Sequence, residues 1–118
     1  MATRRIRVGV IGLGFGLYHI RGYQQCPDVE VFAVCTRTDE TVKNVAREYG
    51  IRHAVTDYRV LLAMEEIEAV SICSPVYLHH GMTLEAIKAG KHVLCEKPLD
   101  PVLSQMKEGF PEKDLGLP

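Results

Sequence analysis

Short apolar runs alternate with longer amphipathic segments along residues 6–95. Runs rich in Val, Ile and Ala predict buried β-strands, while apolar residues spaced three and four apart predict helices. Gly50 and Gly90 directly follow two of the helical segments, at positions typical of helix C-termini. We expect strands at 6–11, 29–35, 52–55, 69–73 and 92–95, and helices at 16–25, 39–49, 58–64 and 77–89.

The regular alternation of strands with helices indicates an α/β fold, in which a parallel sheet carries helices on both faces. Right-handed crossovers leave few topologies, and we expect a doubly wound, Rossmann-like sheet of order 3-2-1-4-5. This order places a ligand crevice at the carboxyl ends of the first and fourth strands. Glycine and polar residues follow strand ends at Gly12–Gly16, Thr36, Ser74–Pro75 and Glu96–Lys97.

The pattern weakens after Pro98. Asp100 and Pro101 are typical of a helix start, and residues 102–108 predict a short helix. Residues 110–118 contain two prolines and a glycine without periodicity, which predicts a flexible tail. We therefore expect a dinucleotide-binding domain at residues 1–101, followed by a short helix and tail at 102–118.

The composition is that of an ordinary globular domain. Of the 118 residues, 47% are hydrophobic and 25% are charged. The formal net charge of −1 gives no reason to expect a nucleic-acid partner. No apolar run approaches the roughly 20 residues of a membrane helix, and the N-terminus lacks a signal-peptide pattern. We therefore expect a cytoplasmic protein without a membrane partner.

The cysteines predict neither a metal site nor a redox site. The chain has four of them, and no two have the Cys-x-x-Cys spacing of zinc or dithiol motifs. We expect free thiols that pack as small apolar side chains.

The loop after the first strand is suited to a phosphate. Gly12 allows a tight turn, and Gly14 lets the backbone approach a pyrophosphate at the helix N-terminus. Phe15 and Gly16 complete the loop, and Leu17 stands where the usual pattern has a third small residue. Two alternatives remain at this point: a turn that serves packing only, and the S-adenosylmethionine site of a methyltransferase.

The end of the second strand bears on which nucleotide is bound. An acidic residue about 20 positions after the loop would bind the ribose hydroxyls of NAD. The chain has Thr36 and Arg37 instead, and a guanidinium offers a charged fork to a 2′-phosphate. This favours NADP over NAD, unless Arg37 is simply a solvated loop residue. Asp39 is too far along to bind the ribose, and we expect it to cap the second helix.

A second block carries a more specific signal. Residues 89–98 read Ala-Gly-Lys-His-Val-Leu-Cys-Glu-Lys-Pro. Together with the glycine loop, this block resembles the glucose–fructose oxidoreductase and inositol dehydrogenase family, over roughly residues 5 to 101. The resemblance implies a cofactor, NAD or NADP, and the oxidation or reduction of sugars, polyols and related compounds.

The resemblance also implies roles for single residues. Lys97 matches a catalytic lysine that lies beside the nicotinamide, where it would bond the substrate oxygen and assist proton transfer. Glu96 would orient the cofactor or Lys97. Ser74 and Pro75 match a Thr-Pro pair that lies against the cofactor, and His79 matches a histidine that positions the structure or the cofactor.

The sequence departs from the family at Leu17, which replaces the small third residue of the loop, and in two further ways. Val76 stands where an asparagine is frequent, and the family's second half, with its Asp-x-x-x-His pair, has no counterpart in the chain. We therefore expect dinucleotide binding with weak or no turnover, and the substrate cannot be read.

The chain can be interpreted as a fragment of an oxidoreductase, a short binding or regulatory module, or one half of a site completed by a partner chain. The Glu-Lys-Pro block argues against the methyltransferase. Because no sixth strand is expected, we predict a homo-oligomer that buries the faces near the fifth strand.

Overall fold

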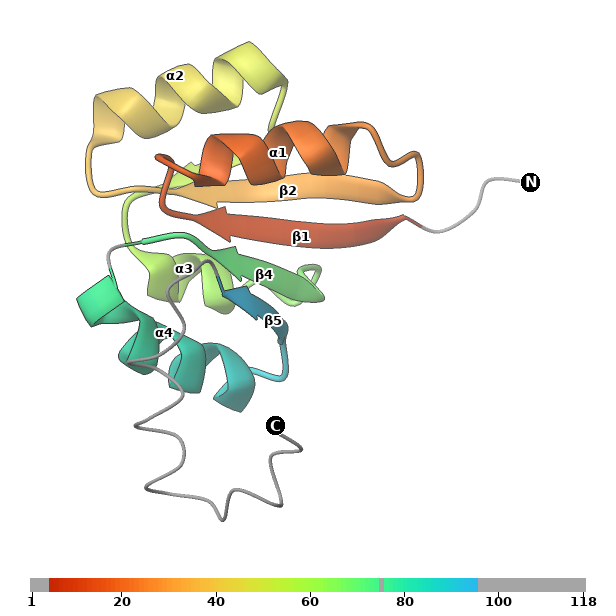
Figure 1. The fold of residues 1–118 in the computed structure, drawn as a ribbon. Coiled ribbons are helices and arrows are strands. Elements are labelled where there is room, and N and C mark those ends of the chain that lie inside the picture. Colours follow the sequence, from red (N-terminus) through yellow and green to blue (C-terminus); the bar gives the residue numbers. More distant parts are fainter. Residues whose placement is uncertain (1–4, 75, 96–118) are drawn as a thin grey trace.

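A computed structural model describes residues 5–74 and 76–95 of the chain (Figure 1). Strands and helices alternate along these residues. The elements are β1 (Ile6–Ile11), α1 (Gly16–Gln24), β2 (Val29–Cys35), α2 (Asp39–Tyr49), β3 (His53–Val55), α3 (Tyr58–Leu62), β4 (Ala69–Ile72), α4 (Val76–Lys88) and β5 (His92–Cys95). The predicted elements within this part of the chain are confirmed, with ends shifted by one or two residues. The helix and tail predicted at 102–118 lie outside the described residues.

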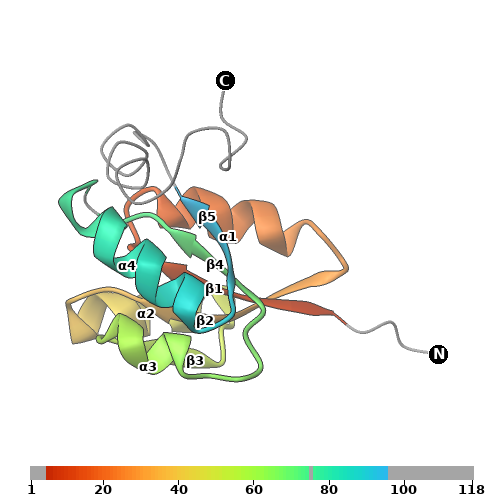
Figure 2. The same ribbon diagram turned by 90° about the horizontal axis from the view of Figure 1, so that it is seen from below.

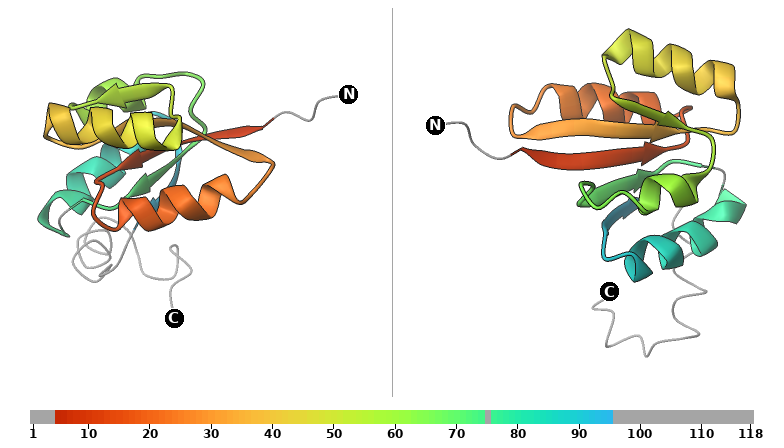
Figure 3. Two further views of the ribbon diagram at one scale, coloured as in Figure 1. Left: turned by 90° about the horizontal axis from the view of Figure 1, so that it is seen from above. Right: turned by 180° about the vertical axis from the view of Figure 1, so that it is seen from behind.

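The strands form one parallel sheet in the order β3-β2-β1-β4-β5, which confirms the predicted topology. Helices α1 and α2 cover one face, as the left view of Figure 3 shows. Helices α3 and α4 lie side by side over the other face (Figure 2). All strands therefore end at the same edge of the sheet, from which the loops to the helices depart.

Two apolar clusters, one on each face, form the core. The first joins α1 and α2 to the sheet through residues that include Val10, Ile20 and Val42. The second joins α3 and α4 to the sheet through residues that include Leu61, Ile72 and Met82. Successive strand residues point to opposite faces, so a continuous apolar strand supplies both clusters.

The register between β1 and β2 shifts once. Val8 pairs with Val31, but the next residue, Gly9, pairs with Ala33, so the partner strand contains an extra residue. Phe32 and Ala33 consequently belong to the same cluster although they are neighbours in sequence. Gly9 faces α3 closely, since a Cβ there would lie 2.6 Å from Cδ2 of Leu61.

The helix ends follow the predicted signals in most cases. Gly50 and Gly90 have positive φ angles of 67° and 78° just after α2 and α4. Asp57 is the N-cap of α3, and its side chain accepts a hydrogen bond from the backbone N–H of Arg59 at 2.9 Å. The cap predicted for α2 is wrong: the extended N-cap position belongs to Thr38, and Asp39 is already helical. The Asp39 carboxylate instead pairs with Lys43 at 2.9 Å.

Charged side chains tie the strands together at the amino edge of the sheet. Glu30 of β2 forms ion pairs with Arg7 of β1 at 3.4 Å and with Arg52 beside β3 at 3.0 Å. Both guanidinium groups also lie over the ring of Phe32. Arg7 and Arg52 thus take part in packing between strands at the edge opposite the glycine loop.

Among the described residues, no helix combines the length and the apolar character that a membrane crossing requires. The same part of the chain holds no group of three or more His, Cys, Asp or Glu side chains arranged to bind a metal ion.

Candidate cofactor site

Gly12 lies where the ends of three strands meet. Its φ angle is +90°, and a Cβ there would lie 2.6 Å from both the carbonyl carbon of Cys73 and the nitrogen of Ser74. The Gly12 N–H donates a hydrogen bond to the carbonyl oxygen of Cys35 at 2.8 Å. Next to it, the N–H of Cys73 donates a hydrogen bond to the carbonyl oxygen of Ile11 at 2.7 Å. Only glycine fits this position, because both the conformation and the space exclude a side chain.

Gly14, unlike Gly12, is surrounded by open space. No heavy atom lies within 4 Å of the position that its Cβ would take, and the residue is exposed. Phe15, which precedes α1 at its N-cap, is 59% exposed. The backbone at Gly14 and Phe15 is therefore open to a ligand at the start of α1, where the N–H groups of Leu17 and Tyr18 donate to the carbonyl oxygens of Gly14 at 3.4 Å and Phe15 at 3.0 Å. This is the geometry in which a helix N-terminus can hold a phosphate.

Gly16 replaces the missing third glycine of the usual pattern. It is buried at the start of α1, and a Cβ would lie 2.9 Å from Cγ1 of Val10 and 3.8 Å from Cβ of Cys73. The close approach of helix to sheet is thus achieved one residue earlier than the standard spacing. Leu17 is half-buried and packs against the cluster under α1, so its contact with a cofactor stays a prediction.

Thr36 and Arg37 follow β2 at the same edge. Thr36 is half-buried and its N–H donates to the carbonyl oxygen of Val55 at 3.4 Å, whereas Arg37 is exposed. The Cys35 carbonyl binds Gly12, so the glycine loop and the start of the β2–α2 connection are held next to each other. Arg37 is thus an exposed, positively charged residue at the same edge as the glycine loop.

Burial, reinforced by the Asp57 carboxylate, raises the pKa of the Cys35 thiol to about 11, from an ordinary value of 9.0. The folded state therefore disfavours the thiolate, and the unfolded chain ionises first as the pH rises. We expect the free energy of unfolding to fall between about pH 9 and pH 11.

Urea unfolding across this range checks the expectation. The wild type should lose more stability with pH than Cys35→Ala, and exposed Cys26→Ala should keep the wild-type slope. Equal slopes for all three proteins would contradict it.

Ser74 adjoins the loop from β4. It is half-buried, its backbone nitrogen lies against Gly12, and its Oγ donates a hydrogen bond to Sδ of Met82 at 3.0 Å. Pro75, Glu96 and Lys97 lie outside the described residues. His79 lies within α4, but its side chain is not among those described.

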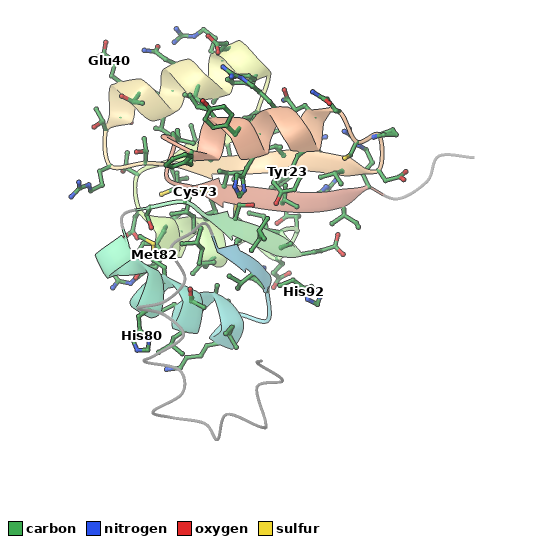
Figure 4. All side chains as sticks on the ribbon, viewed as in Figure 1. Tyr23, Glu40, Cys73, His80, Met82 and His92 are labelled. Atoms are coloured by element: carbon green, nitrogen blue, oxygen red, sulfur yellow. The ribbon has the colours of Figure 1, made fainter. Side chains whose placement is uncertain are left out.

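The structure therefore brings four predicted groups together at the carboxyl edge: the glycine loop, Thr36, Arg37 and Ser74. In Figure 4, Cys73 and Met82 lie toward the edge to which the arrowheads of β1 and β4 point, and His92 lies toward the opposite edge. Sequence reasoning missed Cys73, whose backbone lies directly against Gly12, and Met82, whose Sδ accepts a hydrogen bond from Ser74. A backbone contact and a sulfur acceptor leave no motif in a single sequence.

This geometry can be compared with known proteins. Residues 6–110 match the family described as "Oxidoreductase family, NAD-binding Rossmann fold". The chain belongs to this oxidoreductase family. The resemblance seen in the sequence is thereby confirmed.

Individual members of the oxidoreductase family are similar to the chain over most of its length. The uncharacterized oxidoreductase YrbE of Bacillus subtilis is 35% identical over 109 residues, which cover 92% of this chain and 32% of YrbE. Myo-inositol 2-dehydrogenase of Thermotoga maritima is 32% identical over 95 residues, 80% of this chain and 28% of that enzyme. The chain thus spans about a third of the length of these relatives.

Among solved structures, the chain is similar to KijD10, a 3-ketoreductase from Actinomadura kijaniata, in complex with TDP-benzene and NADP. The TM-score is 0.76 at 31% identity, and the similarity covers 89% of this chain and 36% of KijD10. The carboxyl edge described above therefore belongs to the NAD-binding domain of an oxidoreductase.

Proposed function

We propose that this chain binds NADP in preference to NAD, as the cofactor-binding part of an oxidoreductase that acts on a sugar or polyol-like substrate. One observation carries the proposal: Gly14 and Phe15 are exposed at the start of α1, while Gly12 packs closely against the backbone of Cys73 and Ser74. The surroundings fit a pyrophosphate, since a Cβ at Gly14 would fill the space that the phosphates need.

Each part of the site has a proposed role. The glycine loop binds the pyrophosphate through backbone N–H groups. Thr36 and Arg37 bind the adenine-side ribose and its 2′-phosphate. We assign to Ser74, Pro75 and His79 contacts with the nicotinamide side of the cofactor. When bound, the nicotinamide supplies the hydride chemistry of the reaction.

Lys97 is the proposed catalytic residue, with Glu96 beside it as the orienting residue. A lysine ammonium can donate a hydrogen bond to the substrate oxygen and hold or release the proton at its Nζ. The names of two relatives support this class of reaction: one is a myo-inositol dehydrogenase, and the other is a 3-ketoreductase in complex with NADP. Weak or absent turnover by this chain alone, a cytoplasmic location and a homo-oligomer stay predictions.

Titration with NADPH and NADH, followed by nicotinamide fluorescence, tests the proposal. We expect NADPH to bind more tightly, and Arg37→Ala to weaken NADPH about 10-fold while changing NADH less than about twofold, because only NADPH carries the 2′-phosphate. Arg47→Ala is the matched control, since Arg47 is exposed in the last turn of α2, the helix that follows Arg37 in the chain. Equal losses for both cofactors would contradict the role of Arg37, and no response to either would contradict binding.

A further inference from the structure

Asp57 places a carboxylate just beyond the carboxyl end of β3. It lies two residues after Val55, the last residue of that strand, and it is exposed. Its Oδ1 accepts a hydrogen bond from the backbone N–H of Arg59 at 2.9 Å. A carboxylate has two oxygens and about four lone-pair positions, so this one backbone contact leaves it able to accept further hydrogen bonds.

The Asp57 carboxylate adjoins the end of β2, where Thr36 and Arg37 lie. Val55 pairs with Cys35 in the sheet, and the Val55 carbonyl oxygen accepts a hydrogen bond from the N–H of Thr36 at 3.4 Å. The charge of Asp57 also contributes to the raised pKa of the Cys35 thiol. Asp57 is therefore next to the place proposed for the adenine-side ribose.

The strand order β3-β2-β1 gives the direction in which a dinucleotide extends along this edge. Under the proposed function, the pyrophosphate binds at the glycine loop after β1, and the adenine-side ribose binds at Thr36 and Arg37 after β2. Neighbouring strands lie about 4.8 Å apart, so the ligand advances by about one strand from pyrophosphate to ribose. The adenine extends from the other side of the ribose, and the next strand end in that direction is the one that Asp57 follows.

The chemistry of adenine matches a carboxylate at this place. Adenine carries an N6 amino group, which donates hydrogen bonds, and an ionised carboxylate only accepts them. A base with a carbonyl oxygen at the same position, such as hypoxanthine or guanine, directs lone pairs at the carboxylate instead.

We propose that Asp57 is a specificity-determining residue of the cofactor site: its carboxylate accepts a hydrogen bond from the N6 amino group of the adenine. The inference rests on the proposed function, because that function supplies the dinucleotide. Asp57 thus has two partners, the backbone N–H of Arg59 within the protein and the base of the ligand.

Comparison of NADPH with its hypoxanthine analogue tests the proposal. The analogue keeps the 2′-phosphate and the reduced nicotinamide but has an oxygen in place of the N6 amino group. Titrations of the full chain, followed by nicotinamide fluorescence, should give a Kd about 10-fold higher for the analogue, as expected from one hydrogen bond to a charged acceptor. Asp57→Asn should reduce the difference to less than about threefold, because an amide can donate to the oxygen as well as accept from the amino group.

The Asp57→Asn variant separates recognition of the base from folding, since asparagine caps a helix about as well as aspartate. Both ligands carry the same phosphates, so the loss of one negative charge changes the two affinities alike and cancels in their ratio. Asp39→Asn is the matched control: Asp39 is exposed in the first turn of α2, after β2, and pairs with Lys43. This variant should keep the preference of the wild type.

Equal affinities of the wild type for the two ligands would overturn the inference, and so would an unchanged preference in Asp57→Asn. A preference lost in Asp39→Asn as well as in Asp57→Asn also contradicts it, since the charge of this edge would then set the preference. Failure of the wild type to bind either ligand is a separate result, which overturns the proposed function and this inference with it.

Discussion

Replacing Gly12 with alanine is expected to lower the free energy of unfolding by about 3 kcal/mol or more and to abolish cofactor binding. Two costs add at this position. An L-residue is strained at a φ angle of +90°, and its Cβ would lie 2.6 Å from the backbone of Cys73 and Ser74. Backbone atoms cannot rotate aside as a side chain can, so relief requires the β1–α1 loop to separate from the end of β4.

Gly14→Ala is the matched control for this prediction. Its φ angle is not positive and its Cβ would have free space, so we expect stability to change by less than about 1 kcal/mol. The same Cβ would occupy the space proposed for the pyrophosphate, so NADPH binding should still weaken. Urea unfolding and cofactor titration of both variants separate the two effects. A Gly12→Ala protein as stable as the wild type would show that the junction is not rigid.

Replacing Lys91 with methionine is expected to cost about 2–3 kcal/mol of stability. Lys91 is half-buried, and its Nζ donates to the carbonyl oxygens of Met64 at 2.7 Å and Ile67 at 2.6 Å. These carbonyls belong to the connection between α3 and β4, so the ammonium joins that connection to the start of β5. Methionine keeps most of the apolar stem but leaves both acceptors without their charged donor.

Lys43→Met provides the comparison for Lys91→Met. Lys43 forms an ion pair with Asp39 on the surface of α2, where both side chains are more than half exposed. Such a pair contributes little, so we expect a loss below about 0.5 kcal/mol in urea unfolding. If the two lysine variants lost the same small amount, the two carbonyl contacts of Lys91 would not contribute as proposed.

The Lys91 contacts also distinguish the structural role of this lysine from the role proposed for a second lysine in the same sequence block. The block Ala89–Pro98 contains Lys91 and Lys97. Lys91 lies before β5, at the amino edge of the sheet, and acts there as a structural donor. Lys97 follows β5 in sequence and lies outside the described residues. Under the proposed function, the block therefore combines a structural lysine, Lys91, with the proposed catalytic residue, Lys97.

The arrangement of the sheet could be predicted because its signals are local. Apolar runs mark the strands, Gly50 and Gly90 mark helix ends, and right-handed crossovers then determine the order. The place of the glycine loop, Thr36 and Ser74 at one edge follows from that order alone. Parallel strands connected by helices bring every carboxyl end to the same edge.

Other features depend on distances that a single sequence does not encode. The extra residue in β2 is one example, since only the packing of Phe32 and Ala33 on the same face reveals it. Gly16 is another: its spacing departs from the usual pattern, and the contact with Val10 explains why a glycine is needed there. The bond from Ser74 to Met82 likewise requires the position of α4 over the sheet.

The central claim is that a nicotinamide dinucleotide binds at the carboxyl edge of the sheet, around Gly14. The most direct test is a ¹H–¹⁵N correlation spectrum of the full chain recorded with increasing NADPH. We predict that the amide resonances of Gly12–Leu17, Thr36 and Ser74 shift in a saturable manner, while those of Arg7, Glu68 and Lys91 at the amino edge stay in place. Shifts confined to the amino edge, or no shifts at saturating NADPH, would contradict the claim.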